Sequence, residues 1–116
     1  MELARAQRIV RVVSVQNRYS FADRTSDDVL AACEREGFAF IPWHPLNLGS
    51  LGERHGALAQ VAAARGVTSA QVALAWLLHR SPAMLPIPGT GSIEHLEENV
   101  AAGALKLTDE EMARLG

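Results

Sequence analysis

A turn rich in glycine and hydroxyl residues could bind a phosphate in the last third of the chain. It lies within Pro86–Asn99, where a short apolar run breaks at Pro88-Gly89 and a helical pattern begins at Ser92. The two glycines of the turn let the backbone approach another group closely, and Thr90 and Ser92 supply hydroxyls. A helix capped by Ser92 would point its first N–H groups outward, at the positive end of its dipole. This strand–turn–helix junction therefore predicts an anion site, most often one for phosphate.

Two further polar clusters follow apolar runs earlier in the chain. Gln16-Asn17 follows the first run and Trp43-His44 follows the second, as Gly89-Thr90 follows the third. Ligands of α/β folds bind at the carboxyl ends of the strands, so we expect the three clusters to meet on one rim. An amide can pair with another amide, and an indole offers a flat stacking surface. The combination suits a nucleotide with an aromatic ring at one end and phosphate at the other.

The elements that must position these residues alternate between helix and strand. Apolar runs, capping residues and glycine stops predict helices at about 2–10, 26–36, 55–65, 69–80, 92–99 and after Thr108, and strands at 12–15, 38–42 and 84–87. Thr25 or Ser26 is expected to cap the second helix and Gly37 to end it. Thr68 and Gln71 form the pattern of a capping box, and the helix that they begin is apolar almost all round, so it should be wedged between other elements.

Strands that alternate with helices indicate a parallel sheet joined by right-handed crossovers. The strands are continuous apolar runs, as expected when helices cover both faces. Three parallel strands leave both outer edges unpaired, and a closed (βα)8 barrel usually needs ~250 residues. We therefore interpret residues 1–116 as a single incomplete α/β domain that is part of something larger or borrows strands from a partner.

Composition narrows the possible classes of protein. The chain of 116 residues is 48% apolar, with a net charge of −2 and scattered basic residues, which indicates a folded domain and favours neither nucleic acid nor membrane as a partner. The single cysteine, Cys33, excludes an internal disulfide and is typical of a reducing cytosol. With no apolar signal core near Met1, the expected location is cytoplasmic. The four histidines have no metal-ligand spacing, so no metal site is predicted.

The motifs together resemble those of the aldo-keto reductase family. They are Ser14–Ser20, Phe40–Leu46, Gln71–Leu78, and Ile87–Ser92 followed by Leu96–Asn99. The similarity covers essentially the whole chain, in the family's order and spacing. It implies the last three parallel strands of a TIM (βα)8 barrel, with their helices and a C-terminal helix. It also implies an oxidoreductase that reduces aldehydes and ketones by hydride transfer from a nicotinamide cofactor, usually NADPH.

Carried over by position, the resemblance implies a set of cofactor-binding residues. Gln16 would hold the nicotinamide carboxamide, Trp43 would stack on the ring, and the loop from Leu46 through Gly49 would cover the pyrophosphate. Thr90 and Ser92 would contact the phosphate on the adenosine side, and Glu98 and Asn99 would meet the adenine end. The full candidate set is Gln16, Trp43, His44, Leu46, Gly49, Gly89, Thr90, Ser92, His95, Glu98 and Asn99.

The chain departs from the family pattern at two levels. Many members carry a basic residue where Gly89 stands and an arginine where His95 stands, and both grip the 2′-phosphate of NADPH; the family as a whole still favours NADP(H) over NAD(H). The catalytic Asp, Tyr, Lys and His of the family lie on earlier strands, and no segment here matches them. Tyr19 belongs to the cluster after Gln16 and is not the catalytic tyrosine. We therefore expect no catalytic residue in this chain and no turnover by it alone.

Alternatives to these interpretations remain open. Gln16 could cap a strand by bonding loop backbone, Trp43 could be a core aromatic, and the turn at Gly89 could be an ordinary helix start. Trp76 fits core packing and Cys33 an inert packed thiol, whereas His95 is the histidine to test. At the level of function, the chain could be a non-catalytic nucleotide-binding module, a module that pairs its open edges with itself or a missing N-terminal half, or a truncated gene product without function.

Overall fold

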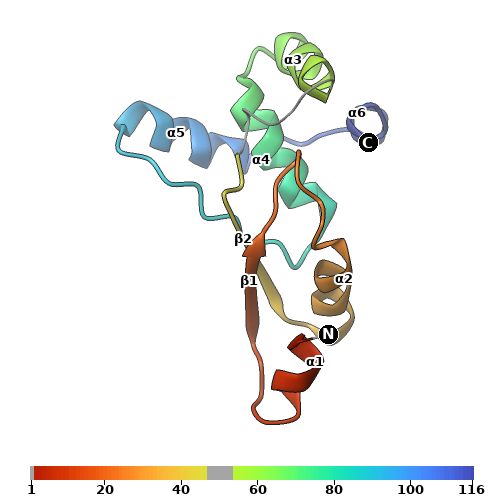
Figure 1. Ribbon diagram of the computed structural model, residues 1–116. Coiled ribbons are helices and arrows are strands. Elements are labelled where there is room, and N and C mark those ends of the chain that lie inside the picture. The colour runs from red at the N-terminus through yellow and green to blue at the C-terminus, as the bar shows by residue number, and fades with distance from the viewer. Residues whose placement is uncertain (1, 47–53) are drawn as a thin grey trace.

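Helices and strands follow one another in the order expected for most of the chain. The computed structural model describes residues 2–46 and 54–116, and Figure 1 shows their arrangement. The elements are α1 (Glu2–Gln7), β1 (Ser14–Arg18), α2 (Asp27–Glu36), β2 (Ala39–Trp43), α3 (Arg54–Arg65), α4 (Ser69–Arg80), α5 (Ile93–Ala102) and α6 (Asp109–Leu115). The alternating α/β character predicted from the sequence is therefore present, with α1 shorter than the segment expected at 2–10.

The sheet contains two strands where we predicted three. β1 and β2 pair in parallel, with Gln16 beside Ile41 and Arg18 beside Trp43. The predicted third strand is reduced to one parallel bridge between Phe40 and Met84. Phe40 N–H donates to Ala83 O, and Leu85 N–H donates to Phe40 O, both at 2.8 Å. The next rung would need an N–H from Pro42, which proline lacks, so the ladder stops there.

The strand boundaries and the cover of the sheet also differ from the prediction. β1 begins at Ser14 and not at Val12, so Gln16 lies inside the strand and not after it. Exposed and half-buried residues alternate along β1, whereas Phe40 and Pro42 of β2 are buried. The expectation of two covered faces was wrong for the part of the chain that the structure describes. One face packs on the helices, and the other, which carries Gln16 and Trp43, is open to solvent.

The core is built around α4, which lies near the centre of the molecule with α3 and α5 packed against it (Figure 1). Every residue from Gln71 to Leu77 is buried, which confirms the expectation of a helix wedged between neighbours. Trp76 stacks on Tyr19 at 6.4 Å between ring centres and meets the edge of Phe21 at 5.2 Å. Tyr19 also packs against Phe40 of β2, 5.5 Å away, so the aromatic rings tie the sheet to the helical layer.

Most helix ends follow local sequence signals. The capping box of α4 is present, since Thr68 Oγ1 accepts from Gln71 N and Gln71 Oε1 accepts from Thr68 N. Gly37 ends α2 with a φ of 77°, in the left-handed region that favours glycine. Ser26, one of the two predicted caps, is the N-cap residue of α2, but its side chain makes no capping bond and instead accepts from Asn17 Nδ2 at 3.3 Å.

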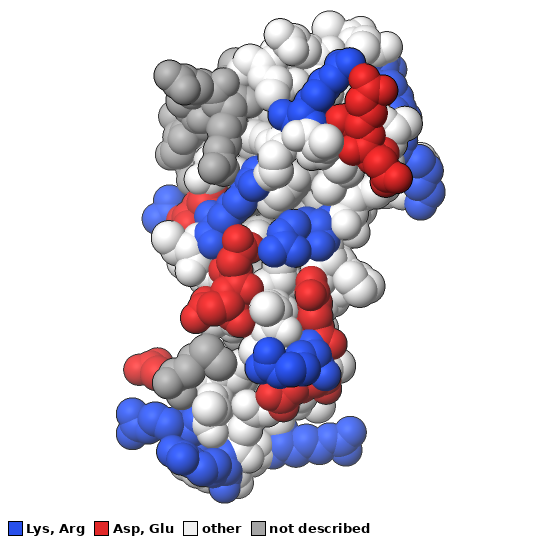
Figure 2. Space-filling view, turned by 90° about the vertical axis from the view of Figure 1, so that its right-hand side faces the viewer, with Lys and Arg blue, Asp and Glu red and all other residues white. Residues whose placement is uncertain are grey.

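Charged side chains of both signs are interspersed on the face drawn in Figure 2. Ion pairs join neighbouring elements, as between Arg80 of α4 and Asp27 of α2 at 3.2 Å, and between Arg65 of α3 and Glu111 of α6 at 2.8 Å. Among the described residues, no single helix is long and apolar enough to cross a membrane; Gly56–Arg65 and Ser69–Arg80 pass that test only as a pair bent by 99°.

Candidate functional site

Two adjoining hollows lie beyond the carboxyl end of β2, and we call them together the rim trough. The first, of about 350 Å³, is lined by His44, Pro45, Leu46, Ile87, Pro88 and Gly89. The second, of about 210 Å³, is lined by Leu46, Thr68, Ala70, Gly89, Thr90, His95, Glu98 and Asn99. Because Leu46 and Gly89 line both, the two hollows lie side by side. Seven residues of the candidate set therefore meet around them: His44, Leu46, Gly89, Thr90, His95, Glu98 and Asn99.

The turn that enters α5 is held by its own hydroxyl groups. Thr90 Oγ1 accepts from Ser92 N at 3.1 Å and lies 3.3 Å from Ser92 O, to which it donates. Ser92 is the N-cap of α5, and its Oγ accepts from His95 N at 3.3 Å. The cap predicted from the sequence is confirmed. Both hydroxyls thus shape the turn, and they present the first turn of α5 to the second hollow.

The glycines of this turn are not required by the fold. Neither Gly89 nor Gly91 has a positive φ, and a Cβ built on either would meet no atom within 4 Å. Gly89 nevertheless lines both hollows, whereas Gly91 lines neither. A side chain at Gly89 would therefore intrude on the rim trough without disturbing the packing, which leaves room for a ligand as the explanation for this glycine.

The far wall of the second hollow was missed by the sequence analysis. Thr68 and Ala70 stand at the start of α4 and line the hollow together with His95, Glu98 and Asn99 of α5. Thr68 was recognised only as a helix cap. Its position as a cap residue could have indicated a place at the edge of the helical layer, because a cap residue lies at the end of its helix. The sequence does not show which site that edge borders, because this depends on how α4 packs against α5.

At the end of the sheet, Trp43 presents its indole to solvent on the open face. The side chain is 45% exposed, so the core alternative for Trp43 does not hold in this structure. The Arg18 guanidinium lies 5.8 Å from the centre of the indole ring. His44 follows with a φ of 58°, a left-handed conformation that is uncommon outside glycine and asparagine. The chain thus turns sharply after β2 and passes directly into the wall of the first hollow.

The remaining candidate cofactor residues do not line the rim trough or lie outside the residues that the structure describes. Gln16 is exposed on the open face, and since it pairs with Ile41, it lies two positions before Trp43 along the sheet. Neighbouring strands place such residues on the same face, so Gln16 and Trp43 share one surface. Ser92 contributes through its cap and does not line either hollow. Gly49 lies outside the described residues.

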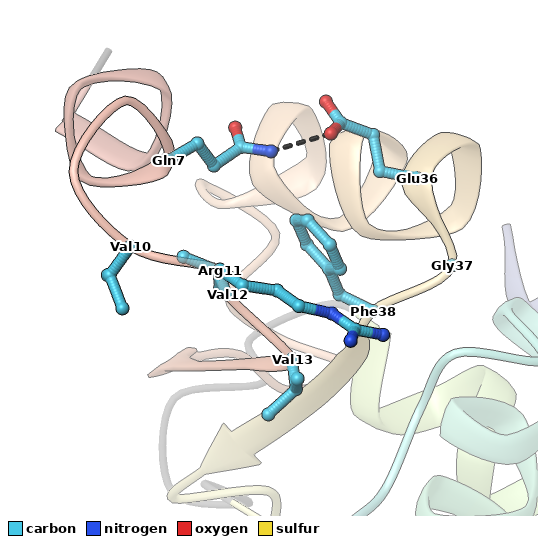
Figure 3. A pocket seen from close by; sticks show the side chains of 8 residues that line it. All are labelled: Gln7, Val10, Arg11, Val12, Val13, Glu36, Gly37 and Phe38. Atoms are coloured by element: carbon cyan, nitrogen blue, oxygen red, sulfur yellow. Dashed lines mark hydrogen bonds between the residues drawn. The ribbon is translucent and has the colours of Figure 1, made fainter.

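A different hollow, shown in Figure 3, lies at the opposite end of the strands, where the chain enters β1 and β2. It has about 270 Å³ and is lined by Gln7, Val10, Arg11, Val12, Val13, Glu36, Gly37 and Phe38. Gln7 Nε2 donates to Glu36 Oε2 at 2.6 Å across its edge. None of the candidate cofactor residues lines it. Within residues 2–46 and 54–116, no group of three His, Cys, Asp or Glu side chains gathers as a metal site would require.

Comparison with known proteins gives one consistent family. Residues 1–116 match the model of the aldo/keto reductase family. The sequence is 44% identical to the uncharacterized oxidoreductase C215.11c of Schizosaccharomyces pombe and 45% identical to pyridoxine 4-dehydrogenase of Escherichia coli, each over 98% of this chain. These alignments cover 37% and 40% of the two relatives, so the chain spans less than half of their length.

Solved structures agree with the sequence comparison. The fold is similar to that of the thermostable aldo-keto reductase Tm1743 in complex with the inhibitor epalrestat, with a TM-score of 0.87 and 34% identity over 98% of this chain and 42% of that one. It is also similar to the aldo/keto reductase from Klebsiella pneumoniae in complex with NADP and acetate, with a TM-score of 0.81 and 36% identity over 89% of this chain and 38% of that one.

Proposed function

Because the chain belongs to the aldo/keto reductase family, we propose that it forms the cofactor-binding part of an oxidoreductase that uses a nicotinamide dinucleotide, with NADP(H) preferred. One observation carries the proposal. Seven of the eleven residues that the resemblance implies for the cofactor line two neighbouring hollows, and Trp43, which directly precedes His44 in the lining, exposes its indole to solvent. The NADP complex of the relative from Klebsiella pneumoniae supports the choice of cofactor.

The positions and chemistry of these residues fit an extended dinucleotide. Trp43 offers a flat apolar surface for a nicotinamide ring, and Gln16 offers an amide on the same face of the sheet. The pyrophosphate would lie near Leu46 and Gly89, which line both hollows. The first turn of α5 would face the phosphate on the adenosine side, and Glu98 and Asn99 would meet the adenine end. His95 lines the same hollow, so a ring N–H of its imidazole would be available to donate to that phosphate.

In the complete reaction, the bound cofactor supplies a hydride to the carbonyl carbon of an aldehyde or ketone. The residues described here orient the dinucleotide, and they include no group proposed to protonate the carbonyl oxygen. We therefore propose reduction of a carbonyl substrate only for a protein in which this chain is combined with the proton-transfer residues of the family. By itself the chain should bind the cofactor and turn over no substrate.

Calorimetric titration of the purified chain with NADPH and NADH tests the binding proposal. We expect saturable binding, tighter for NADPH. A parallel assay with NADPH and 4-nitrobenzaldehyde should show no consumption of NADPH. If neither dinucleotide bound at millimolar concentration, the proposed function would be wrong. If the chain alone reduced the aldehyde, the proposal that the proton-transfer groups lie elsewhere would be wrong.

A second candidate function is an edge-pairing module, favoured by the apolar surface next to the third strand position. Leu85 is 54% exposed and Val100 of α5 is 71% exposed, and a hollow of about 260 Å³ between α4, α5 and residues 85–88 is lined mostly by apolar side chains. Such a surface could pack against a second copy or a separate N-terminal half. Size-exclusion chromatography with light scattering tests this function: a well-folded, monodisperse monomer would argue against it.

A further inference from the structure

One buried side chain joins the two walls of the second hollow. Gln71 of α4 is 9% exposed. Its Oε1 accepts from Thr68 N at 3.0 Å, and its Nε2 donates to Glu98 O of α5 at 3.0 Å. Thr68, at the start of α4, and Glu98, on α5, both line the second hollow. A single amide therefore bonds to one lining residue from each of the two helices.

Besides this hydrogen bond, α5 is held by its packing against α4. Its outward face is exposed, with Ile93 at 79% and Val100 at 71%, and Ala102 is the residue of this helix that the core buries. The Gln71 amide is largely buried and bonded at both ends, so losing one bond leaves a polar group without its partner or shifts the helix. The bond from Gln71 is thus well placed to hold α5 at one distance from the start of α4.

We propose that Gln71 is a positioning residue that sets the width of the second hollow and through it the affinity for the adenosine-phosphate half of the dinucleotide. The proposal rests on the function proposed above. Gln71 does not line the hollow, so its effect passes through Thr68 and Glu98. The nicotinamide half, which meets the sheet end at Trp43, should be independent of it.

The substitution Gln71→Glu isolates the bond to α5. Glutamate keeps the oxygen that accepts from Thr68 N, so the capping box is retained, but it puts a second oxygen where Nε2 donated to Glu98 O. Two facing oxygens repel, and α5 should move away from α4. We expect binding of adenosine 2′,5′-bisphosphate, measured by calorimetry, to weaken about fivefold or more, as the loss of one buried hydrogen bond implies. Binding of reduced nicotinamide mononucleotide should be unchanged.

Two further variants complete the experiment. Gln60→Glu makes the same chemical change on an exposed position of α3 and should leave both affinities unchanged. Gln71→Met keeps the side-chain length and loses both bonds without adding charge, so it should show the same selective loss and replaces Gln71→Glu if that variant lacks a native circular dichroism spectrum.

The outcomes separate this inference from the function on which it rests. If the unchanged chain binds both half-molecules and the Gln71 variants weaken both equally, or neither, the positioning role is overturned while the proposed function stands. If the unchanged chain binds NADPH but not adenosine 2′,5′-bisphosphate, this inference is overturned while the proposed function stands. If it binds neither dinucleotide, the proposed function fails and this inference fails with it.

Discussion

Arg18 and Trp43 occupy paired positions at the ends of β1 and β2, and the guanidinium carbon of Arg18 lies 5.8 Å from the centre of the indole ring. Arg18 Nε is in turn 3.3 Å from Asp23 Oδ2. A hydrogen bond from the Thr25 hydroxyl is the largest of the effects that hold the pKa of Asp23 below its ordinary value, so this carboxylate is charged at neutral pH. A small charged network therefore borders the exposed indole on one side, which steadies the ring while leaving surface free for a ligand.

Substitutions of the two tryptophans should have separate effects, one on cofactor binding and the other on stability. Trp43 is 45% exposed and Trp76 is 1% exposed. Trp43→Leu should weaken NADPH binding about tenfold, because stacking on an aromatic side chain is worth about 1–3 kcal/mol, and should change the free energy of unfolding little. Trp76→Phe should do the reverse, lowering stability by about 1–3 kcal/mol through lost packing while NADPH affinity is retained. Calorimetry and urea unfolding measure the two quantities, and equal NADPH affinity in Trp43→Leu would remove this residue from the site.

Gly89 and Gly91 offer a matched pair for testing the rim trough. Alanine at either position fits the folded chain without a close contact, so neither change should lower the melting temperature. Only Gly89 lines the hollows. Gly89→Ala should therefore weaken dinucleotide binding several-fold, by about 1 kcal/mol, while Gly91→Ala leaves it unchanged. Equal affinities in the two variants would contradict a cofactor path over Gly89.

Stability should fall in alkaline solution because of Tyr19, the single tyrosine of the chain. Burial, and next the hydrogen bond to Asp27, raise the pKa of Tyr19 well above its ordinary value of 10.0. A raised pKa in the folded state means that the stabilisation is complete below about pH 10 and is lost as the pH rises further. The phenolate absorbance should appear together with the loss of circular dichroism. Tyr19→Phe should lower the free energy of unfolding by about 1 kcal/mol near neutral pH and should weaken its decrease at alkaline pH. A phenolate signal that appears while the chain is still folded would contradict the burial of Tyr19.

Stability in acid should depend on Glu111. A hydrogen bond from Thr108 N, and next the Arg65 guanidinium, lower the pKa of Glu111 from its ordinary value of 4.5. A lowered pKa means that the stabilisation is present above about pH 4.5 and disappears as the pH falls through the value in the folded state. Glu111→Gln should therefore lower the free energy of unfolding at neutral pH. In unfolding experiments, the free energy of this variant should also change less between neutral and acid pH than that of the unchanged chain.

Glu97→Gln supplies the control for the acid experiment, since it removes a carboxylate from an exposed position of α5. Its loss of stability in acid should match that of the unchanged chain. If both variants reduced the loss of stability in acid equally, the effect would come from net charge and not from the bond between α3 and α6.

Local signals predicted the helices well for a specific reason. The capping boxes at Thr68 and Thr108, the glycine stop at Gly37 and the cap at Ser92 each depend on backbone groups within a few residues. The family resemblance was confirmed over residues 1–116 on the same basis, because its motifs are runs of neighbouring residues. Where a side chain had another partner nearby in space, the local signal held only in part: Ser26 is the N-cap residue of α2, but its hydroxyl bonds to Asn17 of β1 and makes no capping bond.

The amino-acid sequence alone determined where most helices begin, the alternating α/β order and the family, but α1 ends earlier and α5 later than the sequence predicted. Only the tertiary structure decided that the third strand stops at one bridge, that Gln16 and Trp43 share an open face, and that Thr68 and Glu98 line one hollow. The reason is physical: the first group depends on interactions between near neighbours in the chain. The second depends on which backbone groups and side chains of distant segments come within bonding distance once the core around α4 has packed.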